Sequence, residues 1–151
     1  MTFVLENYNH VIEELKPMLS DHYEEVAMYQ DKIPLEPNYD DYKEMQKLKR
    51  LYLFTWREGS ELVGYNIFLV GSHLHYKSNK FAWNDVVYVR PDYRHKGQTI
   101  EFFKFCEDFL KEEAGVSVIT YHMKVSKMFK ALMDLLEMDH AEHIYTKYIG
   151  N

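Results

Sequence analysis

The sequence lacks the features that mark disulfide-linked and membrane proteins. It has one cysteine, Cys106, so no disulfide can form within the chain. No stretch reaches the roughly 18 consecutive apolar residues that a membrane-spanning helix needs. The opening residues, MTFVLENYNH, contain no basic start followed by an apolar block. We therefore expect a cytoplasmic protein without a membrane partner, and we interpret Cys106 as a small buried hydrophobic residue.

Basic residues are also scarce relative to acidic ones. The chain has 18 Lys and Arg against 24 Asp and Glu, a formal net charge of -6. Non-specific nucleic-acid binding depends on many cations that neutralise phosphates, so this balance argues against such a partner. The length of 151 residues, the 46% of hydrophobic residues and the absence of a Gly/Ser-rich linker predict one folded domain over residues 1–151.

Apolar periodicity predicts alternating helices and strands. Apolar residues recur at helical spacing in the segment after Gln98, which is the clearest helix pattern of the chain. A proline inside the first helical pattern, Pro17, is expected to bend or split that helix. The predicted order is strand 2–6, helix 9–29, loop 32–41, helix 39–50, strands 51–56, 61–70 and 81–89, a helix from 98, strand 116–123, a helix from 128 and strand 143–149. This order indicates an α/β fold of the α+β kind, a mixed sheet covered by helices.

A basic, glycine-containing loop precedes the clearest helix. The strand 81–89 is followed by Pro91, and "RHKGQT" then runs from Arg94 into the helix. The first N–H groups of a helix have no partner within it and lie at the positive end of its dipole, so they bind anions. Gly97 suits such a site because glycine permits positive φ and places no side chain over the amides. The alternative is an ordinary helix start with solvated basic residues.

This loop, in its strand-to-helix setting, resembles the pyrophosphate loop of the GNAT N-acetyltransferase superfamily. That loop reads Arg/Gln-x-x-Gly-x-Gly/Ala, and Arg94 and Gly97 match it, whereas Thr99 replaces the last small residue. "YVRPDYR" is similar to the preceding family segment, "ELVGYNIF" to its third strand and "ALMDLLEMDHAEHIYTKYI" to its last helix and strand. The resemblance implies a mixed, mostly antiparallel sheet of six to seven strands flanked by about four helices.

The resemblance also implies acetyl-coenzyme A (acetyl-CoA) as cosubstrate, in a cleft where two parallel strands separate. The pantetheine arm would pair with main-chain groups of Val87 and Val89, as an added strand would. The diphosphate would lie on the loop, with these residues as the cofactor-binding set: Arg94, His95, Lys96, Gly97, Gln98 and Thr99. The hydroxyl of Thr99 would donate a hydrogen bond that offsets its bulk. Paired domains are common in such proteins, which favours a homodimer.

Acetyl transfer to an amine needs a base and benefits from an acid. Asp85 is the candidate base, since it lies in an apolar strand and alternation puts it on one face with Trp83 and Val87; a carboxylate bonded to a neighbouring loop is the alternative. The resemblance places the usual acid, a tyrosine, where Met133 stands. Tyr121 is the candidate substitute, with His122 beside it, although both could be ordinary strand residues.

Two histidines, His73 and His75, share a predicted strand face in "GSHLHYK". Their spacing could suit a metal, but no further ligand is evident nearby, so we expect ordinary polar residues or cleft lining and no metal site.

Two functions remain open. The first is an acetyl-CoA-dependent N-acetyltransferase acting on an amine of a small molecule or protein. The second is a catalytically weak or inactive interaction protein of the same fold, which Met133 and Thr99 favour. Segments such as HLHYK and YRHKG resemble acetyltransferase-like proteins encoded by tailed bacteriophages, some of which serve in virion assembly or act against the host.

Overall fold

The computed structural model describes residues 1–94 and 97–150. A five-stranded sheet with strand order β1-β2-β3-β4-β5 forms its centre, antiparallel throughout except for the parallel pair β4 and β5. The elements are β1 (Thr2–Glu6), α1 (Tyr8–Val26), α2 (Tyr39–Lys47), β2 (Leu51–Glu58), β3 (Glu61–His73), β4 (Tyr76–Val89), a 3-10 turn (Pro91–Tyr93), α3 (Gln98–Glu112), β5 (Val116–Thr120), a second 3-10 turn (Val125–Lys127) and α4 (Lys130–Leu135).

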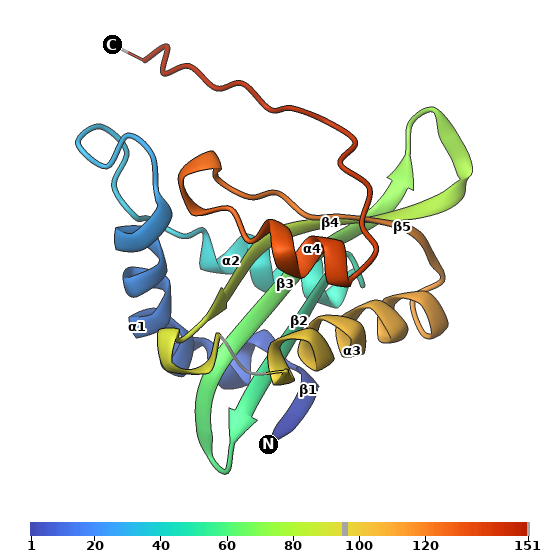
Figure 1. The fold of residues 1–151 in the computed structure, drawn as a ribbon, viewed down its shortest axis with the longest axis horizontal. Helices are drawn as coiled ribbons and strands as arrows, with labels where there is room; N and C mark the ends of the chain where they lie inside the picture. Colours follow the sequence, from blue (N-terminus) through green and yellow to red (C-terminus); the bar gives the residue numbers. More distant parts are fainter. Residues whose placement is uncertain (95–96, 151) are drawn as a thin grey trace.

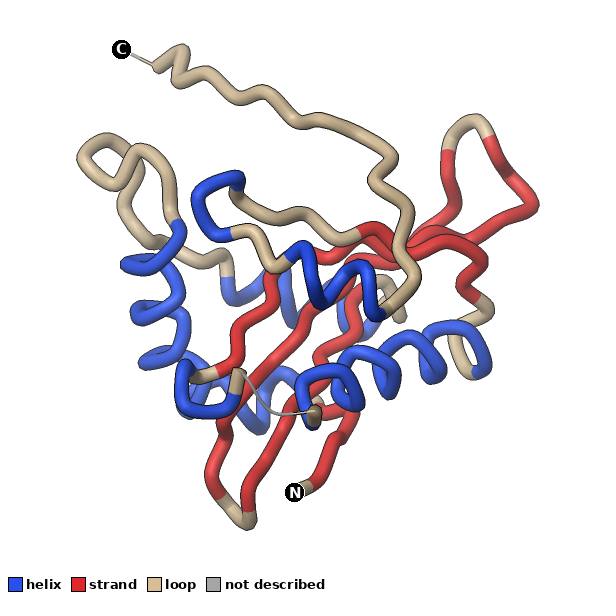
Figure 2. The backbone as a smooth tube through the Cα atoms, in the orientation of Figure 1, coloured by secondary structure: helices blue, strands red, loops and turns tan. Residues whose placement is uncertain are grey.

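Helices cover both faces of the sheet, and each face has its own apolar cluster (Figures 1 and 2). On one face α1 contributes Val11 and Leu15, which pack with Tyr65 and Ile67 of β3. On the other face α3 and α4 cover a second cluster. Its members include Phe54, Phe68, Val89, Phe102, Cys106, Leu110 and Met133. Cys106 is buried there as the apolar pattern of its helix predicts.

Pro17 does not split the first helix. The helix α1 runs without interruption from Tyr8 to Val26, with the side chain of Asn7 accepting a hydrogen bond from the N–H of Asn9 at its start. Pro17 lies on the exposed side of the helix, while Leu15 and Met18 are buried against the sheet. Packing of the buried stripe therefore outweighs the backbone hydrogen bond that a proline cannot donate.

The prediction of six to seven strands is wrong, because the sheet has five. Residues 143–149 have a strand-like sequence but form no strand. They belong to an extended C-terminal tail that runs across the top of the view in Figure 1, and Tyr145 is 92% exposed. A strand needs a neighbouring edge to supply hydrogen bonds, and β-propensity alone does not provide one. The strand predicted over 116–123 likewise ends at Thr120.

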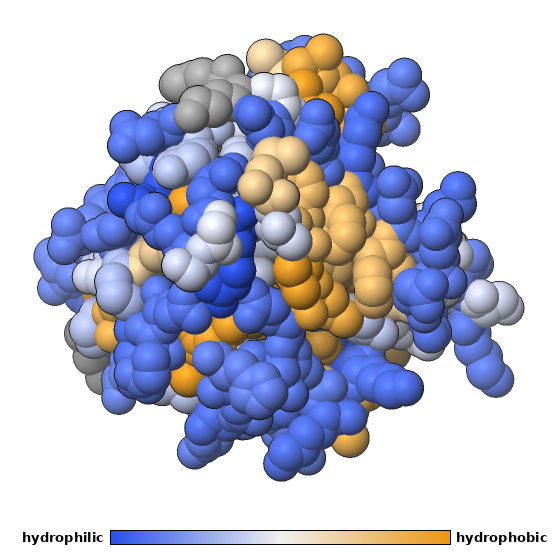
Figure 3. All heavy atoms as spheres, turned by 90° about the horizontal axis from the view of Figure 1, so that it is seen from below, coloured by the Kyte–Doolittle hydropathy of each residue, from blue (hydrophilic) through white to orange (hydrophobic). Residues whose placement is uncertain are grey.

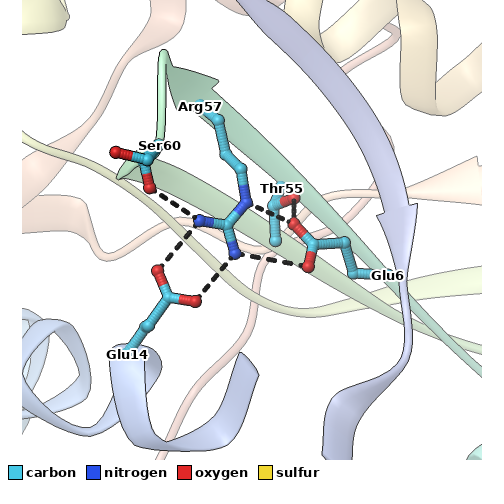
Figure 4. Close-up of polar contacts among 5 residues, drawn as sticks. All are labelled: Glu6, Glu14, Thr55, Arg57 and Ser60. Atoms are coloured by element: carbon cyan, nitrogen blue, oxygen red, sulfur yellow. Dashed lines mark hydrogen bonds and ion pairs between the residues drawn. The ribbon is translucent and has the colours of Figure 1, made fainter. Parts of the chain in front are cut away.

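The arginine Arg57 ties the first two strands and the first helix together (Figure 4). Its Nε donates to Glu6 Oε1 at 2.6 Å, and its two terminal nitrogens reach the carboxylate of Glu14 at 2.9 and 3.0 Å. Thr55 Oγ1 donates to the same Glu6 oxygen at 2.5 Å. The Arg57 side chain is only 17% exposed, so these bonds lie largely out of solvent.

Replacing Arg57 with Met should destabilise the fold by about 3 kcal/mol, because two carboxylates would lose their common partner while Glu6 stays largely buried. Urea unfolding measures this free energy. Arg90, whose ion pair with Glu61 is much more exposed, is the matched control. Its change to Met should cost less than about 1 kcal/mol. Equal losses for the two variants would show that the Arg57 cluster has no special role.

The face seen from below is mainly hydrophilic, with a band of apolar atoms near its centre and smaller apolar groups elsewhere (Figure 3). Within the described part of the chain, no helix combines the length and apolar character that crossing a membrane requires.

Candidate functional site at the open edge of β4

Strand β5 pairs with only part of β4. Their last paired residues are Trp83 and Thr120. Beyond that point β4 continues to Val89 along β3 alone, so residues 84–89 have no strand on their other side among the described residues. An unpaired strand edge presents N–H and C=O groups that a ligand can use in place of a strand.

Val87 and Val89 direct their main-chain groups to this open edge. The N–H of Arg90 donates to the carbonyl of Val63 in β3 at 2.9 Å, which fixes Arg90 as a residue that faces β3. Because the groups alternate along a strand, Val89 and Val87 face the opposite way. The main-chain groups of these two residues therefore do not pair with β3, and their expected pairing with the pantetheine arm stays a prediction. The carbonyl of Val89, however, already accepts from Arg94 Nε at 2.6 Å.

A β-bulge places Asp85 at the start of the open edge. Phe68 pairs with Asn84 and Ile67 pairs with Val86, so Asp85 is the extra residue on β4. The buried side chain of Asn84 bridges the bulge: its Nδ2 lies 2.7 Å from Asn66 Oδ1 and 3.2 Å from the carbonyls of Ile67 and Val86. Asn84 therefore fixes the backbone geometry on which the position of Asp85 depends.

The bulge also changes which side chains share a face. Val86 packs with the cluster under α1 and α2, whereas Val87 packs with the cluster under α3. Asp85 lies on the α2 side, because Tyr42 Oη of α2 donates to its Oδ2 at 2.6 Å. The expectation that Asp85 and Val87 share a face is wrong, since simple alternation does not hold across an inserted residue.

Two stacked tyrosines support the carboxylate of Asp85. The rings of Tyr42 and Tyr8 lie 5.2 Å apart and almost parallel, with an interplanar angle of 6°. Burial, reinforced by the hydrogen bond to Asp85, raises the pKa of Tyr42 well above its usual range. Tyr42 therefore stays a hydrogen-bond donor at neutral pH. Asp85 itself is exposed, which leaves its other oxygen accessible to a ligand.

The start of α3 lies beyond the end of β4 and carries no side-chain cap from the described residues. Gly97 has φ of -51° and ψ of -24°, which are ordinary helical values, so the expectation of positive φ is wrong. A Cβ built on Gly97 meets no described atom within 4 Å. Glycine is thus not required by the backbone, and the space where a side chain of residue 97 would stand is free of described atoms. An uncapped helix start of this kind suits an anion.

Arg94 points away from this space. Its guanidinium forms a two-fold ion pair with Glu25 of α1, with N to O distances of 2.6 and 2.7 Å, and lies 5.1 Å over the ring of Tyr88. The hydrogen bond from Arg94 lowers the pKa of Glu25. The expected free charge at Arg94 is therefore neutralised by Glu25, and the side chain instead joins β4 to α1. His95 and Lys96 lie outside the described residues.

Thr99 and Gln98 flank the same helix start. The Thr99 hydroxyl is turned inward and lies 3.2 Å from the carbonyls of Tyr93 and Arg94, so it closes the loop on the helix. Its β-branched side chain does not stand over the amides. Gln98 Oε1 is buried and has no hydrogen-bond partner among the described residues.

Tyr121 lies on the α3 side of the sheet, opposite to Asp85. Its ring packs against Phe68 and Phe103, and its hydroxyl is buried near the side chain of Asn66. Burial raises the pKa of Tyr121 strongly, and the neighbouring Cys106 and Glu107 raise it further. The two candidate catalytic residues are therefore held by different faces of the sheet.

Glu107 of α3 has one carboxylate oxygen buried without a partner in the described structure. Burial and the nearby Asp108 raise its pKa from 4.5 to about 7. The fold therefore favours the protonated form, and its stability should fall as the pH rises from about 4.5 through 7.

Replacing Glu107 with Gln should remove this fall in the free energy of unfolding with rising pH. At pH 8 the variant is expected to be more stable than the unchanged protein by about 1 kcal/mol. This value allows for the screening of the partly exposed Glu107 carboxylate by solvent. At acidic pH the two proteins should have similar stability. Thermal unfolding across this pH range measures the difference. Glu101→Gln, on the exposed side of the same helix, is the control. A Glu107→Gln variant that is less stable than the unchanged protein at pH 8 would contradict the assignment.

The two histidines of the hairpin do not share a strand face. His73 ends β3, whereas His75 lies in the turn and donates its N–H to His73 Nδ1 at 3.1 Å. Across the described residues, no group of three or more His, Cys, Asp and Glu is arranged to hold a metal ion.

Several residues of the site escape sequence reasoning. Tyr42 and Tyr8 reach Asp85 only through long-range packing, and no spacing in the sequence marks them. The hydrogen bonds by which Asn84 bridges the bulge could not be predicted either, although an asparagine next to an aspartate inside an apolar strand is a weak signal for a bulge. His22 of α1 is a further polar residue, partly buried, with its Nδ1 3.0 Å from the hydroxyl of Tyr65.

The sequence and the fold were compared with those of known proteins. The model of the acetyltransferase (GNAT) family matches residues 12–143. No curated protein sequence matches the chain significantly.

Solved structures share the fold at low sequence identity. Ribosomal-protein-alanine N-acetyltransferase from Brucella melitensis matches with a TM-score of 0.63 and 17% identity, covering 100% of this chain and 99% of that one. A predicted acetyltransferase from Clostridium acetobutylicum, solved with acetyl-CoA, gives 0.72 and 9% over 98% and 96%. Glucosamine-6-phosphate N-acetyltransferase from Arabidopsis thaliana gives 0.71 and 13% over 99% and 100%. With a family model that spans most of its length, the chain belongs to the acetyltransferase (GNAT) family.

Proposed function

We propose that this protein is an acetyl-CoA-dependent N-acetyltransferase that transfers an acetyl group to an amine. The observation that carries the proposal is the open edge of β4 next to an uncapped helix start. The β4 edge from Asp85 to Val89 has no described strand beside it other than β3, and the start of α3 has no side-chain cap among the described residues. A strand-like arm with a diphosphate at its end has the chemistry to use both features.

The described residues fit acetyl-CoA in this arrangement. The N–H and C=O of Val87 and the N–H of Val89 would pair with the two amides of the pantetheine arm. The amides of Gly97, Gln98 and Thr99 would bind the diphosphate at the positive end of α3. Arg94 serves as a support rather than a ligand, because Glu25 and the Val89 carbonyl already hold its side chain. We extend the proposal to the loop residues His95 and Lys96 from the family motif.

Acetyl-CoA would supply the acetyl group as a thioester. In the reaction a bond forms between the acceptor nitrogen and the acetyl carbon, the bond from that carbon to sulfur breaks, and the nitrogen loses a proton. Asp85 would accept this proton, since its carboxylate lies at the start of the open edge and keeps one oxygen accessible. The departing thiolate needs a proton, and Tyr121 is our candidate donor because burial raises the pKa of its hydroxyl, which therefore carries its proton at neutral pH.

The proposal is tested by mixing the protein with acetyl-CoA and a panel of amines and by measuring free thiol together with acetylated amine. We expect both products in equal amounts with at least one amine. Thiol release without acetylated amine would indicate hydrolysis, and the absence of both products across the panel would count against the enzyme.

The alternative function is an interaction protein of the same fold. Met133, at the position of the usual tyrosine, is buried in the core under α4 and offers no proton. The alternative requires that acetyl-CoA fails to bind while a protein partner is retained through purification. Saturable binding of acetyl-CoA together with turnover would exclude it.

A further inference from the structure

A pocket on the α1 and α2 side of the sheet adjoins Asp85. It lies between α1, the 27–38 segment, α2 and the sheet, and has a cavity volume of about 210 Å³. Val86, the residue after Asp85, lines the pocket, and so does Tyr42, whose hydroxyl donates to Asp85. Two direct neighbours of Asp85 therefore belong to the wall of this pocket.

The lining of the pocket is apolar and carries no positive charge from the described residues. Leu15, Leu19, Leu35 and Ile67 are among the apolar residues of its wall, and no Lys or Arg of the described chain contributes. Two of its tyrosine hydroxyls are already engaged, because Tyr23 donates to the carbonyl of Ile33 and Tyr42 to Asp85. Few hydrogen bonds are thus left for a polyhydroxylated ligand, which would lose bonds to water without replacement.

The charge and the volume of the pocket limit the class of ligand further. Glu36 lines the pocket and Asp85 adjoins it, so a cation is favoured and a phosphorylated ligand is repelled. The volume of about 210 Å³ equals roughly seven water molecules. It is smaller than the roughly 300–1,000 Å³ of sites for drug-sized ligands.

We propose that the acceptor is a small primary amine with an apolar body, such as a single aromatic ring or a short alkyl chain, whose body fills this pocket while its ammonium group meets Asp85. This inference rests on the proposed transferase function and names its substrate class. Aminosugars and sugar phosphates fit the pocket less well, because the first need many hydrogen bonds and the second carry negative charge.

The experiment compares benzylamine with glucosamine, spermidine and benzyl alcohol. Direct binding is measured by ligand-observed NMR with the protein alone, and turnover is measured with acetyl-CoA. We expect benzylamine to bind at least about tenfold more tightly than benzyl alcohol or glucosamine and to give the highest kcat/KM. Equal or better binding and turnover of glucosamine or spermidine would overturn the inference.

A charge variant tests the pocket itself. Leu35 lies in the exposed 27–38 segment, so Leu35→Lys should leave the fold intact while placing a cation at the pocket. We expect the KM for benzylamine to rise at least about tenfold and the affinity for acetyl-CoA to stay unchanged. Leu74→Lys, at the 97% exposed hairpin tip, is the matched control and should behave like the unchanged protein. An unaltered KM in the Leu35→Lys variant would show that the pocket does not hold the acceptor.

The two proposals fail in different ways. If acetyl-CoA binds and an amine outside this class is acetylated, the substrate class is wrong and the transferase function stands. If benzylamine binds but acetyl-CoA does not, the transferase function is wrong while the pocket assignment stands.

Discussion

Gly97→Asp is expected to lower the affinity for acetyl-CoA by at least about 100-fold, which corresponds to about 2.8 kcal/mol. The new carboxylate would stand over the first amides of α3 and would repel the diphosphate that we place there. Gly97 has helical φ and ψ, and a side chain built on it meets no described atom within 4 Å, so the fold should tolerate the change. Titration calorimetry of the variant measures the loss.

Two controls separate charge from shape in this experiment. Gly97→Ala adds one carbon without charge and should weaken binding far less than Gly97→Asp. Asn79→Asp adds the same charge to the exposed β3–β4 hairpin and should leave binding unchanged. If Gly97→Asp binds acetyl-CoA as tightly as these controls, the diphosphate does not lie at the start of α3.

Asp85→Asn is expected to lower kcat by about 10²–10⁴-fold, the usual contribution of a general base. Asparagine keeps the size of the side chain and can still accept from Tyr42, but it cannot take up a proton. The affinity for acetyl-CoA should therefore remain, because Asp85 does not contact the diphosphate in this arrangement. Steady-state kinetics with a saturating amine gives kcat, and calorimetry gives the affinity.

Variants around Asp85 test the specificity of that effect. Tyr42→Phe removes the 2.6 Å hydrogen bond but keeps the carboxylate, so its kcat should fall much less than that of Asp85→Asn. Asp40→Asn removes an exposed carboxylate from the first turn of α2 and should have no effect. An unchanged kcat in the Asp85→Asn variant would rule out Asp85 as the base, whatever the effect of Tyr42→Phe.

The arrangement of helices and strands follows from local patterns in the sequence. The apolar stripe of α3 and the strands predicted over 51–56 and 61–70 depend on neighbours within a few residues, and all of them form. The segment 143–149 does not form a strand, because its alternation specifies a strand only where a free edge is present to pair with it. Pro17 is tolerated for the opposite reason, since burial of Leu15 and Met18 supplies support that the local pattern does not show.

The candidate site is only partly readable from the sequence. The end of β4 and the helix start after Gly97 form as the local pattern predicts, whereas the binding roles expected of Val87 and Gly97 stay predictions. The sequence gives only a weak signal for the bulge at Asp85, since the residue inserted in β4 becomes visible only in the register of β4 with β3. The ion pair of Arg94 with Glu25 joins residues that lie far apart in the chain, so no motif indicates it.

The most direct test of the central claim is an NMR titration of the isotope-labelled protein with acetyl-CoA, in which the amide signals report where the ligand lies. We predict saturable shifts of Val87, Val89 and Gly97, with little change at Leu74 on the distant hairpin. Amide signals that stay unmoved at millimolar ligand, or shifts that cluster away from β4 and the start of α3, would contradict the account.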